Sequence, residues 1–190
     1  MWQFPGWWKI GEFESGVGSW LLVNNGEAML LEVPEGLKVE HIERALEQIG
    51  LPMLRAIGTS HSHEDHLDEN TWRLIKHRWW PIPYVVDPRD YQGPLIFDLG
   101  GEKLFVRYAP KHSYDDIIVI FRGVCFTGDI ELGTLDSVNR EVNLPTKRKT
   151  MRNLATFEED ANYKVHTTHS AHCNDTRTNV DWKSLFMVKE

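Results

Sequence analysis

The feature that most constrains this chain is a cluster of candidate metal ligands at residues 61–66, which read His-Ser-His-Glu-Asp-His. The cluster directly follows an apolar segment, Leu54 to Gly58, that is expected to be a buried strand. A loop at the end of such a strand can aim several side chains at one point on a rigid base. Imidazole and carboxylate suit zinc, iron or manganese, whereas thiolates would indicate a structural zinc. The cluster therefore predicts a metal site rather than a loop that is rich in histidine by chance.

The rest of the chain alternates β-hairpins with helices. Asn24-Asn25-Gly26 predicts a hairpin turn between strands at 19–24 and 27–33. Apolar residues at helical spacing predict a helix over 39–49, and Asp68 is expected to cap a second helix that extends to about Trp79. Further strands are expected at 84–87, 95–99, 103–109, 116–121, 124–127 and 163–168, with a polar helical segment at 146–160. This pattern favours an α/β sandwich with its helices outside.

Three further candidate ligands lie at the ends of expected strands. His112 precedes the strand at 116–121, Asp129 follows the strand at 124–127, and His169 ends the strand at 163–168. A single histidine is more often a structural group than a ligand. The position that these residues share, beside a strand end, favours all three together as parts of one site.

Together these segments resemble the metallo-β-lactamase superfamily from about Ser19 to Ser170. Residues 61–66 are similar to the defining motif of that family, and the segments HSYDDIIVIF, CFTGDI and VHTTHS resemble its later motifs. The resemblance implies an αββα sandwich, with two mixed β-sheets and helices on the outer faces. It also implies that residues 1–190 form one domain.

The resemblance implies a centre of two divalent metal ions that share one bridging carboxylate, Asp129. The ligands that it implies for the first ion are His61, His63 and His112. Those that it implies for the second ion are Asp65, His66 and His169. Asp65 is also the candidate catalytic residue, which would orient the nucleophile or relay its proton.

The last ligand is the least constrained of the set. Ser170 stands where the family usually has glycine after this histidine, and His166 and His172 lie nearby. In an alternating strand, His166 and His169 point to opposite faces. His169 is preferred because it ends the strand, and the other two histidines stay open as alternatives.

The groups that would support the metal ligands are also open. Glu32 stands where the family often has aspartate, and Pro34 stands where a turn with glycine is usual. Carboxylates commonly hold the second nitrogen of a ligating imidazole. Asp68, Asp115 and Glu64 are available for this role, and the sequence does not choose among them.

The function that the resemblance implies is that of a metal-dependent hydrolase. Two divalent ions, zinc with iron or manganese as alternatives, would supply a metal-activated hydroxide that cleaves a small ester, lactone, thioester or amide. One alternative is an oxidoreductase similar to the sulfur dioxygenases of this fold, which use one iron. Another alternative is a non-catalytic relative that binds metal.

Candidate substrate contacts are Lys111, which could bind a carboxylate, and Tyr114, both beside His112. A solvated surface charge is the alternative interpretation of Lys111. The tryptophan pairs at 7–8 and 79–80 either pack in the core or form an aromatic rim around a pocket.

Composition narrows the partners and the location. The net charge of −7 disfavours nucleic acid, whose binding depends on many Lys and Arg contacts to phosphate. Two cysteines cannot form a disulfide framework, and no leader or membrane-length apolar run is visible. We therefore expect a cytoplasmic protein with a small-molecule substrate and no membrane or nucleic-acid partner. A homodimer, in which a second copy walls the pocket, stays open.

Overall fold

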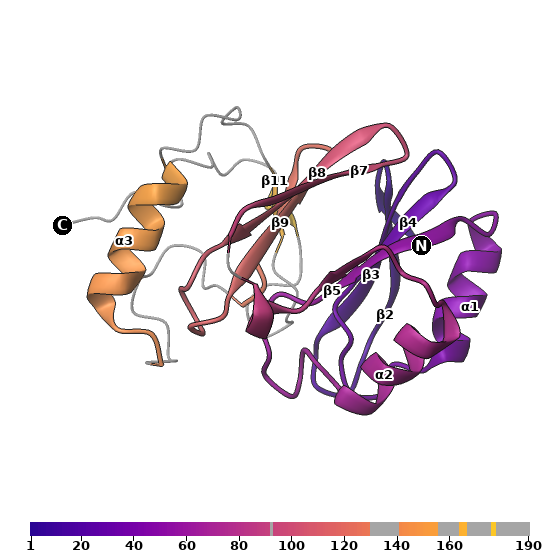
Figure 1. Ribbon diagram of the computed structural model, residues 1–190, viewed down its shortest axis with the longest axis horizontal. Helices are drawn as coiled ribbons and strands as arrows, with labels where there is room; N and C mark the ends of the chain where they lie inside the picture. Colours follow the sequence, from indigo (N-terminus) through magenta and orange to yellow (C-terminus); the bar gives the residue numbers. More distant parts are fainter. Residues whose placement is uncertain (92, 130–140, 156–163, 167–175, 178–190) are drawn as a thin grey trace.

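The strands of this chain form two six-stranded β-sheets, as shown in Figure 1. The structure, a computed structural model, describes residues 1–91, 93–129, 141–155, 164–166 and 176–177. The first sheet contains, in spatial order, β1 (Trp2–Phe4), β2 (Trp7–Glu12), β3 (Gly18–Asn24), β4 (Glu27–Leu31), β5 (Met53–Gly58) and β6 (Tyr84–Val86). The second contains β12 (Thr176–Arg177), β11 (Lys164–His166), β10 (Val124–Phe126), β9 (Ile117–Phe121), β8 (Glu102–Tyr108) and β7 (Leu95–Leu99).

Both sheets mix antiparallel and parallel pairs. In the first sheet, β3 and β4 form the hairpin predicted from the sequence, with Asn24 paired to Glu27. Asn25 and Gly26 both have positive φ, 41° and 78°, which is the backbone shape that tight two-residue hairpins prefer. β5 and β6 then add in parallel to β4, and in the second sheet β11 adds in parallel to β10. Parallel neighbours need crossover connections, and the helices supply them in the first sheet.

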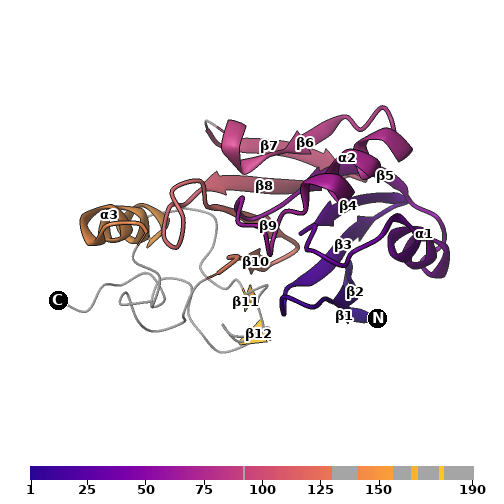
Figure 2. The ribbon, with the colours of Figure 1, turned by 90° about the horizontal axis from the view of Figure 1, so that it is seen from below.

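Helices α1 (Val39–Gln48) and α2 (Glu69–Arg78) cover the outer face of the first sheet. Their buried side chains, which include Ile42 and Trp72, pack against Leu30 and Ile57 of the sheet. Asp68 caps α2 as expected, because its Oδ1 accepts a hydrogen bond from Thr71 N at 2.7 Å. Helix α3 (Leu144–Ala155) lies on the side of the second sheet, as Figures 1 and 2 show. The αββα sandwich predicted from the sequence is therefore confirmed.

The main core lies between the two sheets. Trp7 is fully buried there and stacks on Phe126 with ring centroids 4.3 Å apart and an interplanar angle of 2°. Trp20 meets Phe126 edge-on, and Tyr84 of β6 stacks on Phe97 of β7. Aromatic pairs of this kind bury large areas and fix the distance between the sheets.

The first strands are the part of the fold that the sequence interpretation did not include. Residues 2–12 form a β-hairpin that extends the first sheet beyond β3. Because side chains alternate along β2, Trp7 enters the core while Trp8 lies half-buried on the opposite face. The first tryptophan pair thus divides between core packing and the surface.

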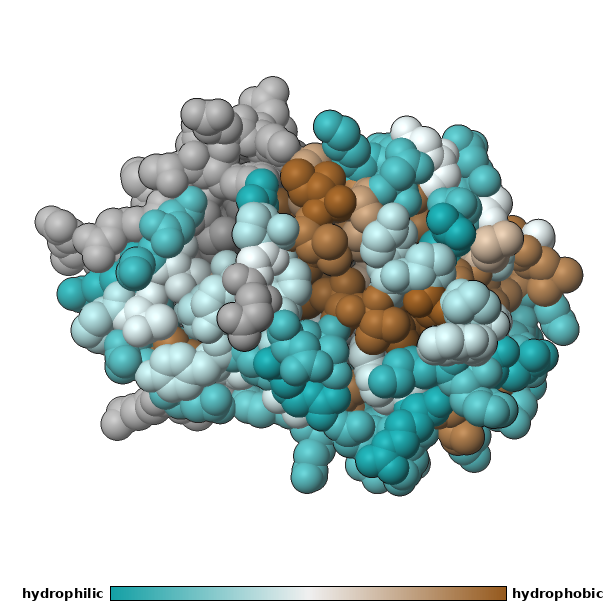
Figure 3. Space-filling view, in the orientation of Figure 1, coloured by the Kyte–Doolittle hydropathy of each residue, from teal (hydrophilic) through white to brown (hydrophobic). Residues whose placement is uncertain are grey.

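Some hydrophobic side chains remain exposed at the surface. On the face shown in Figure 3, a hydrophobic band crosses the middle of the molecule, with hydrophilic side chains on both sides of it. The edge strands β6 and β7 carry Val85 and Ile96, which are 43% and 50% exposed. Within the described ranges, no helix is long and apolar enough to cross a membrane.

Candidate metal centre

Loops from both sheets meet at the candidate centre. The loop after β5 carries residues 61–66, the loop between β8 and β9 carries His112, and Asp129 follows β10. Ser60 O accepts a hydrogen bond from Ile117 N at 2.8 Å, which ties the first loop to the second sheet. Within the first loop, His66 N and Leu67 N both donate to His63 O at 2.9 Å. These backbone bonds fix the directions of the side chains that follow.

Three imidazoles form the first cluster. The candidate ligand atoms of His61, His63 and His112 all lie within 4.8 Å of one another. His63 Nδ1 is 3.2 Å from His112 Nε2, and the ring centroids of His61 and His63 are 4.6 Å apart. This set is the one that the family resemblance implied for the first ion.

The second cluster shares His61 with the first. It comprises His61, His66 and Asp129, with candidate ligand atoms again within 4.8 Å of one another. Asp129 Oδ1 is 3.1 Å from His66 Nε2, and Asp129 Oδ2 is 3.7 Å from His112 Nε2. The two carboxylate oxygens therefore face different clusters, as expected of a bridging ligand.

The donor set fits a divalent metal ion. His61 Nε2 is buried, and among the described residues it has no hydrogen-bond partner. A buried nitrogen in this state is costly unless something outside the protein occupies it. Nitrogen and oxygen donors without thiolates match the preferences of zinc, iron and manganese.

Comparison with known proteins agrees with this geometry at the level of the fold. No protein-family model and no curated protein matches the sequence. Among solved structures, ETHE1 from Myxococcus xanthus has a TM-score of 0.66 at 17% identity, with 90% of this chain and 79% of that chain covered. The BLEG-1 B3 metallo-β-lactamase has a TM-score of 0.65 at 17% identity, covering 86% and 91%. The metallo-β-lactamase family protein TTHA1429 from Thermus thermophilus has a TM-score of 0.61 at 17% identity, covering 97% and 78%.

This chain has the metallo-β-lactamase fold. The resemblance inferred from residues 61–66 and the later segments is thus confirmed as a fold. In this fold, loops from the two sheets meet at one site. That arrangement explains why candidate ligands 68 residues apart, His61 and Asp129, lie in one cluster.

Within this metallo-β-lactamase fold, Glu32 contacts His66 on the side of the imidazole opposite Asp129. Its Oε2 is 3.3 Å from His66 Nδ1 and accepts hydrogen bonds from Thr59 Oγ1 at 2.6 Å and Ser60 N at 3.1 Å. Glu32 is fully buried and has a φ of 67°, a region that non-glycine residues seldom adopt. The sequence marked Glu32 as a departure from the family pattern but did not assign it this contact.

The segment around Pro34 supports the same loop. Val33 N donates to His66 O at 3.1 Å, and Asp68 N donates to Val33 O at 2.7 Å. These two bonds join Val33, which follows β4, to the C-terminal end of the turn that carries His66. The segment that contains Pro34 therefore still supports the loop, because the neighbouring residue Val33 makes these backbone hydrogen bonds.

Asp116 organises the loop that carries His112. Its Oδ2 accepts hydrogen bonds from Lys111 N, His112 N and Ser113 N at 3.0, 2.5 and 2.8 Å. Its Oδ1 is 3.7 Å from His61 Nδ1. The same carboxylate therefore lies close to candidate ligands from loops of both sheets. Sequence reasoning offered Asp115 instead. The signal that could have indicated Asp116 is an acidic residue at the start of an otherwise apolar segment.

Lys111 does not reach solvent as a substrate contact would. Its side chain is 3% exposed, and Nζ lies 3.4 Å from Asp116 Oδ2. The ammonium group therefore offsets the charge of Asp116 inside the protein. Neither interpretation from the sequence, a substrate contact or a solvated charge, describes this buried pair.

The pKa values of the buried ligands follow from their neighbours. Burial lowers the pKa of His61 well below its ordinary value, and the charges of His66 and His112 lower it further, so His61 stays neutral. Burial alone would lower the pKa of His66, but the charge of Glu32 and a hydrogen bond to Asp129 raise it to about 10. Burial raises the pKa of Glu32, but the charge of His66 and hydrogen bonds outweigh it, so its pKa is lowered. Two carboxylates thus hold positive charge at His66, where a divalent cation can replace the proton.

The remaining predicted site residues lie in different positions. Asp65 is at the rim, with its side chain 36% exposed and Oδ2 3.9 Å from His66 Nε2. Tyr114 is 46% exposed, and its hydroxyl accepts a hydrogen bond from Asn143 Nδ2 at 3.1 Å. His169 and its alternative His172 lie outside the described residues, and so does the side chain of His166.

Glu141 is a contact that no sequence pattern indicated. Its Oε2 lies 3.0 Å from His63 Nε2, on the side of the imidazole away from the 3.2 Å contact between His63 Nδ1 and His112. A carboxylate in this position fixes the tautomer that leaves Nδ1 free to act as a ligand. His61, His66 and His63 thus each lie near a carboxylate on the side away from the cluster.

Proposed function

We propose that this chain is a metal-dependent hydrolase with a dinuclear centre, loaded with zinc, that cleaves a small ester, lactone, thioester or amide. The observation that carries the proposal is the pair of clusters that share His61, with the Asp129 carboxylate facing both. Several structures of the same fold are named as metallo-β-lactamases, which supports hydrolysis as the reaction class.

Within this proposal the ligands divide between two ions. His61, His63 and His112 would hold the first, and Asp65, His66 and His169 the second, with Asp129 shared. When bound, the ions supply Lewis acidity that lowers the pKa of water toward neutrality and stabilises developing negative charge.

The residues of the chain supply orientation and proton handling. Glu32 lies 3.3 Å from Nδ1 of His66, and Ser60 Oγ lies 3.0 Å from Nδ1 of His61 with Asp116 beyond it, so that Nε2 of each ring can face the centre. Asp65 is half-exposed at the rim beside the buried His66. Its carboxylate can therefore accept a proton at the site and release it to solvent.

One observation favours a second candidate function. His61, His112 and Asp129 form a set of two histidines and one carboxylate, with His61 and His112 ring centroids 5.0 Å apart and Asp129 Oδ2 3.7 Å from His112 Nε2. Such a set suits a single iron(II) ion in an oxygen-dependent enzyme. This alternative needs neither His63 nor His66 as a ligand.

Metal analysis of the wild type and of His66→Ala separates the two candidates. The hydrolase predicts two zinc ions per chain, a loss of one ion in the variant, and turnover of chromogenic esters, lactones or thioesters. About one iron per chain, unchanged in the variant, would support the oxygenase instead. If the protein binds no metal even after reconstitution, both proposals are wrong.

A further inference from the structure

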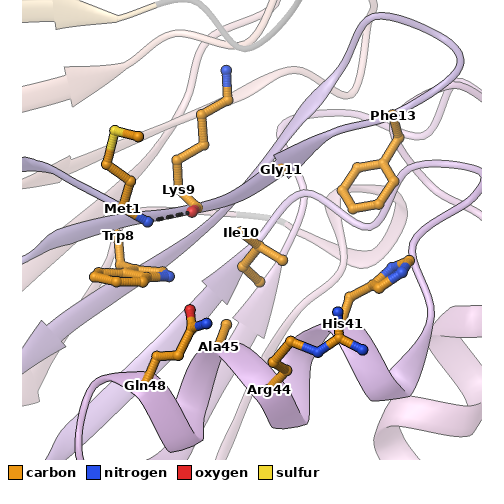
Figure 4. Close-up of a pocket in the computed structure, with 10 residues that line it drawn as sticks. All are labelled: Met1, Trp8, Lys9, Ile10, Gly11, Phe13, His41, Arg44, Ala45 and Gln48. Atoms are coloured by element: carbon orange, nitrogen blue, oxygen red, sulfur yellow. Dashed lines mark hydrogen bonds between the residues drawn. The ribbon is translucent and has the colours of Figure 1, made fainter.

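A second pocket lies on the outer side of the first sheet, between β2 and α1. It encloses about 280 Å³ (Figure 4). Its apolar walls come from Trp8 and Ile10 of β2, Phe13 beyond the strand, and Ala45 of α1. This volume lies just below the usual range for ligand pockets, about 300–1,000 Å³, and suits one or two fused rings.

The helix side of the pocket presents polar groups with no acidic residue among them. Figure 4 shows Arg44, His41 and Gln48 on the face of α1 that is turned toward β2. Spacings of three and four residues place these side chains side by side. His41 Nδ1 accepts a hydrogen bond from Lys38 N at 3.2 Å, so the proton of a neutral ring is on Nε2 and is available to an acceptor.

Arg44 has an unused charge at this pocket. Its guanidinium forms no ion pair with any carboxylate of the described residues, although acidic side chains lie nearby. Glu43 pairs with Arg78 at 2.7 Å, and Glu12 pairs with Lys9 at 3.1 Å. Those two acids are thus engaged elsewhere, and no acidic residue lines the pocket, whose lining includes the cations Arg44 and Lys9 beside aromatic walls.

We propose that this pocket binds a small organic anion with a planar apolar body, such as an aromatic carboxylate. The ring would lie against Trp8 and Phe13, and the carboxylate would meet the guanidinium of Arg44. The planar guanidinium matches a carboxylate with two parallel hydrogen bonds, and aromatic faces favour a flat partner. The site is separate from the metal centre, because its lining residues include none of the candidate ligands.

The test uses 2-naphthoate as the probe and the full-length, metal-loaded protein. Affinity is measured by calorimetry, and the location of binding is measured from the indole N–H signal of Trp8, assigned with Trp8→Phe. The charge is tested with Arg44→Gln, and Arg73→Gln is the matched control, since Arg73 is an exposed arginine on the other helix, α2. The neutral analogue 2-naphthalenemethanol tests the charge of the ligand.

We expect naphthoate to shift the Trp8 signal and to bind Arg44→Gln about three- to tenfold more weakly than wild type, which is the effect of losing one exposed charge-assisted pair. Arg73→Gln should bind like wild type, and the neutral analogue should not distinguish the three proteins. Equal naphthoate affinity in both variants, or no shift at Trp8, would overturn the proposal.

Binding at the metal centre is the main competing outcome, because carboxylates also coordinate metal ions. In that case chelation would abolish naphthoate binding and Arg44→Gln would leave it unchanged, and the proposal would be wrong. Under the proposal, binding survives chelation. Thermal unfolding of both arginine variants should match wild type, because neither side chain is buried. The outcome is independent of whether the metal centre is hydrolytic.

Discussion

Replacing Glu32 by glutamine tests whether a carboxylate behind His66 tunes the metal centre. The substitution keeps the shape of the side chain and removes its charge. The glutamine oxygen can still accept from Thr59 Oγ1 and Ser60 N, the contacts now made by Oε2. The amide NH2 must then occupy the place of Oε1, which is buried and has no hydrogen-bond partner within the described residues.

Two effects follow from this geometry. Loss of the charge 3.3 Å from His66 Nδ1 should weaken metal binding about 10- to 100-fold, or about 1.4–2.7 kcal/mol. Loss of a charge-assisted contact, with a buried NH2 left unpaired, should lower the free energy of unfolding of the metal-free protein by about 2 kcal/mol. Both effects arise at one residue that is fully buried.

Zinc competition with a chromogenic chelator measures the first effect, and urea unfolding measures the second. Glu27→Gln is the matched control. Glu27 begins β4, the strand that ends just before Glu32; it accepts from Gly100 N at 2.8 Å, pairs with Arg55 and belongs to neither cluster. The control should lose some stability and keep its zinc affinity. If Glu32→Gln binds zinc as tightly as the control, the reasoning that links Glu32 to the metal through His66 fails.

Three further predictions address the shared ligand, the core and the close approach of two loops. Asp129→Ala should bind fewer than one metal ion per chain by elemental analysis and lose more than about a hundredfold of hydrolysis, because both clusters lose the carboxylate that faces them. Trp7→Ala should lower the free energy of unfolding by about 3–5 kcal/mol in urea, whereas Leu74→Ala, at a side chain 59% exposed, should change it by less than about 0.5 kcal/mol. Gly128→Ala should cost at least about 1 kcal/mol more than Gly26→Ala and weaken zinc binding. Both glycines have positive φ, but their surroundings differ. A Cβ added at position 128 would lie 2.6 Å from the side chain of Ser60, the neighbour of His61, whereas a Cβ added at position 26 would have nothing within 4 Å. Equal unfolding energies for the two glycine variants would contradict the close approach.

Local patterns in the sequence predicted most of the fold. The turn at residues 24–26, the apolar spacing in 39–49 and the cap at Asp68 are each readable within one segment, and the structure places β3, β4, α1 and α2 there. The hairpin at residues 2–12 was missed. Its glycines and proline interrupt the pattern, and its strands are ordered by pairing with β3. Such pairing depends on a distant partner and leaves little local signal.

The candidate centre was likewise predictable only in part from the sequence. His61, His63 and His66 are visible in the sequence because one loop carries them all, and His112 and Asp129 were marked by their positions beside strands. Their mutual distances follow from the meeting of two sheets, which no spacing along the chain expresses.

The sequence by itself determined the kinds of donor atom, the loop that carries most of them and the class of fold. Only the tertiary structure decided that Glu32, Asp116 and Glu141 lie behind the imidazoles and that Lys111 is buried against Asp116. The physical reason is that ligand chemistry belongs to individual side chains. Burial, charge pairing and tautomer choice depend instead on which segments pack together, and here those segments lie on different sheets.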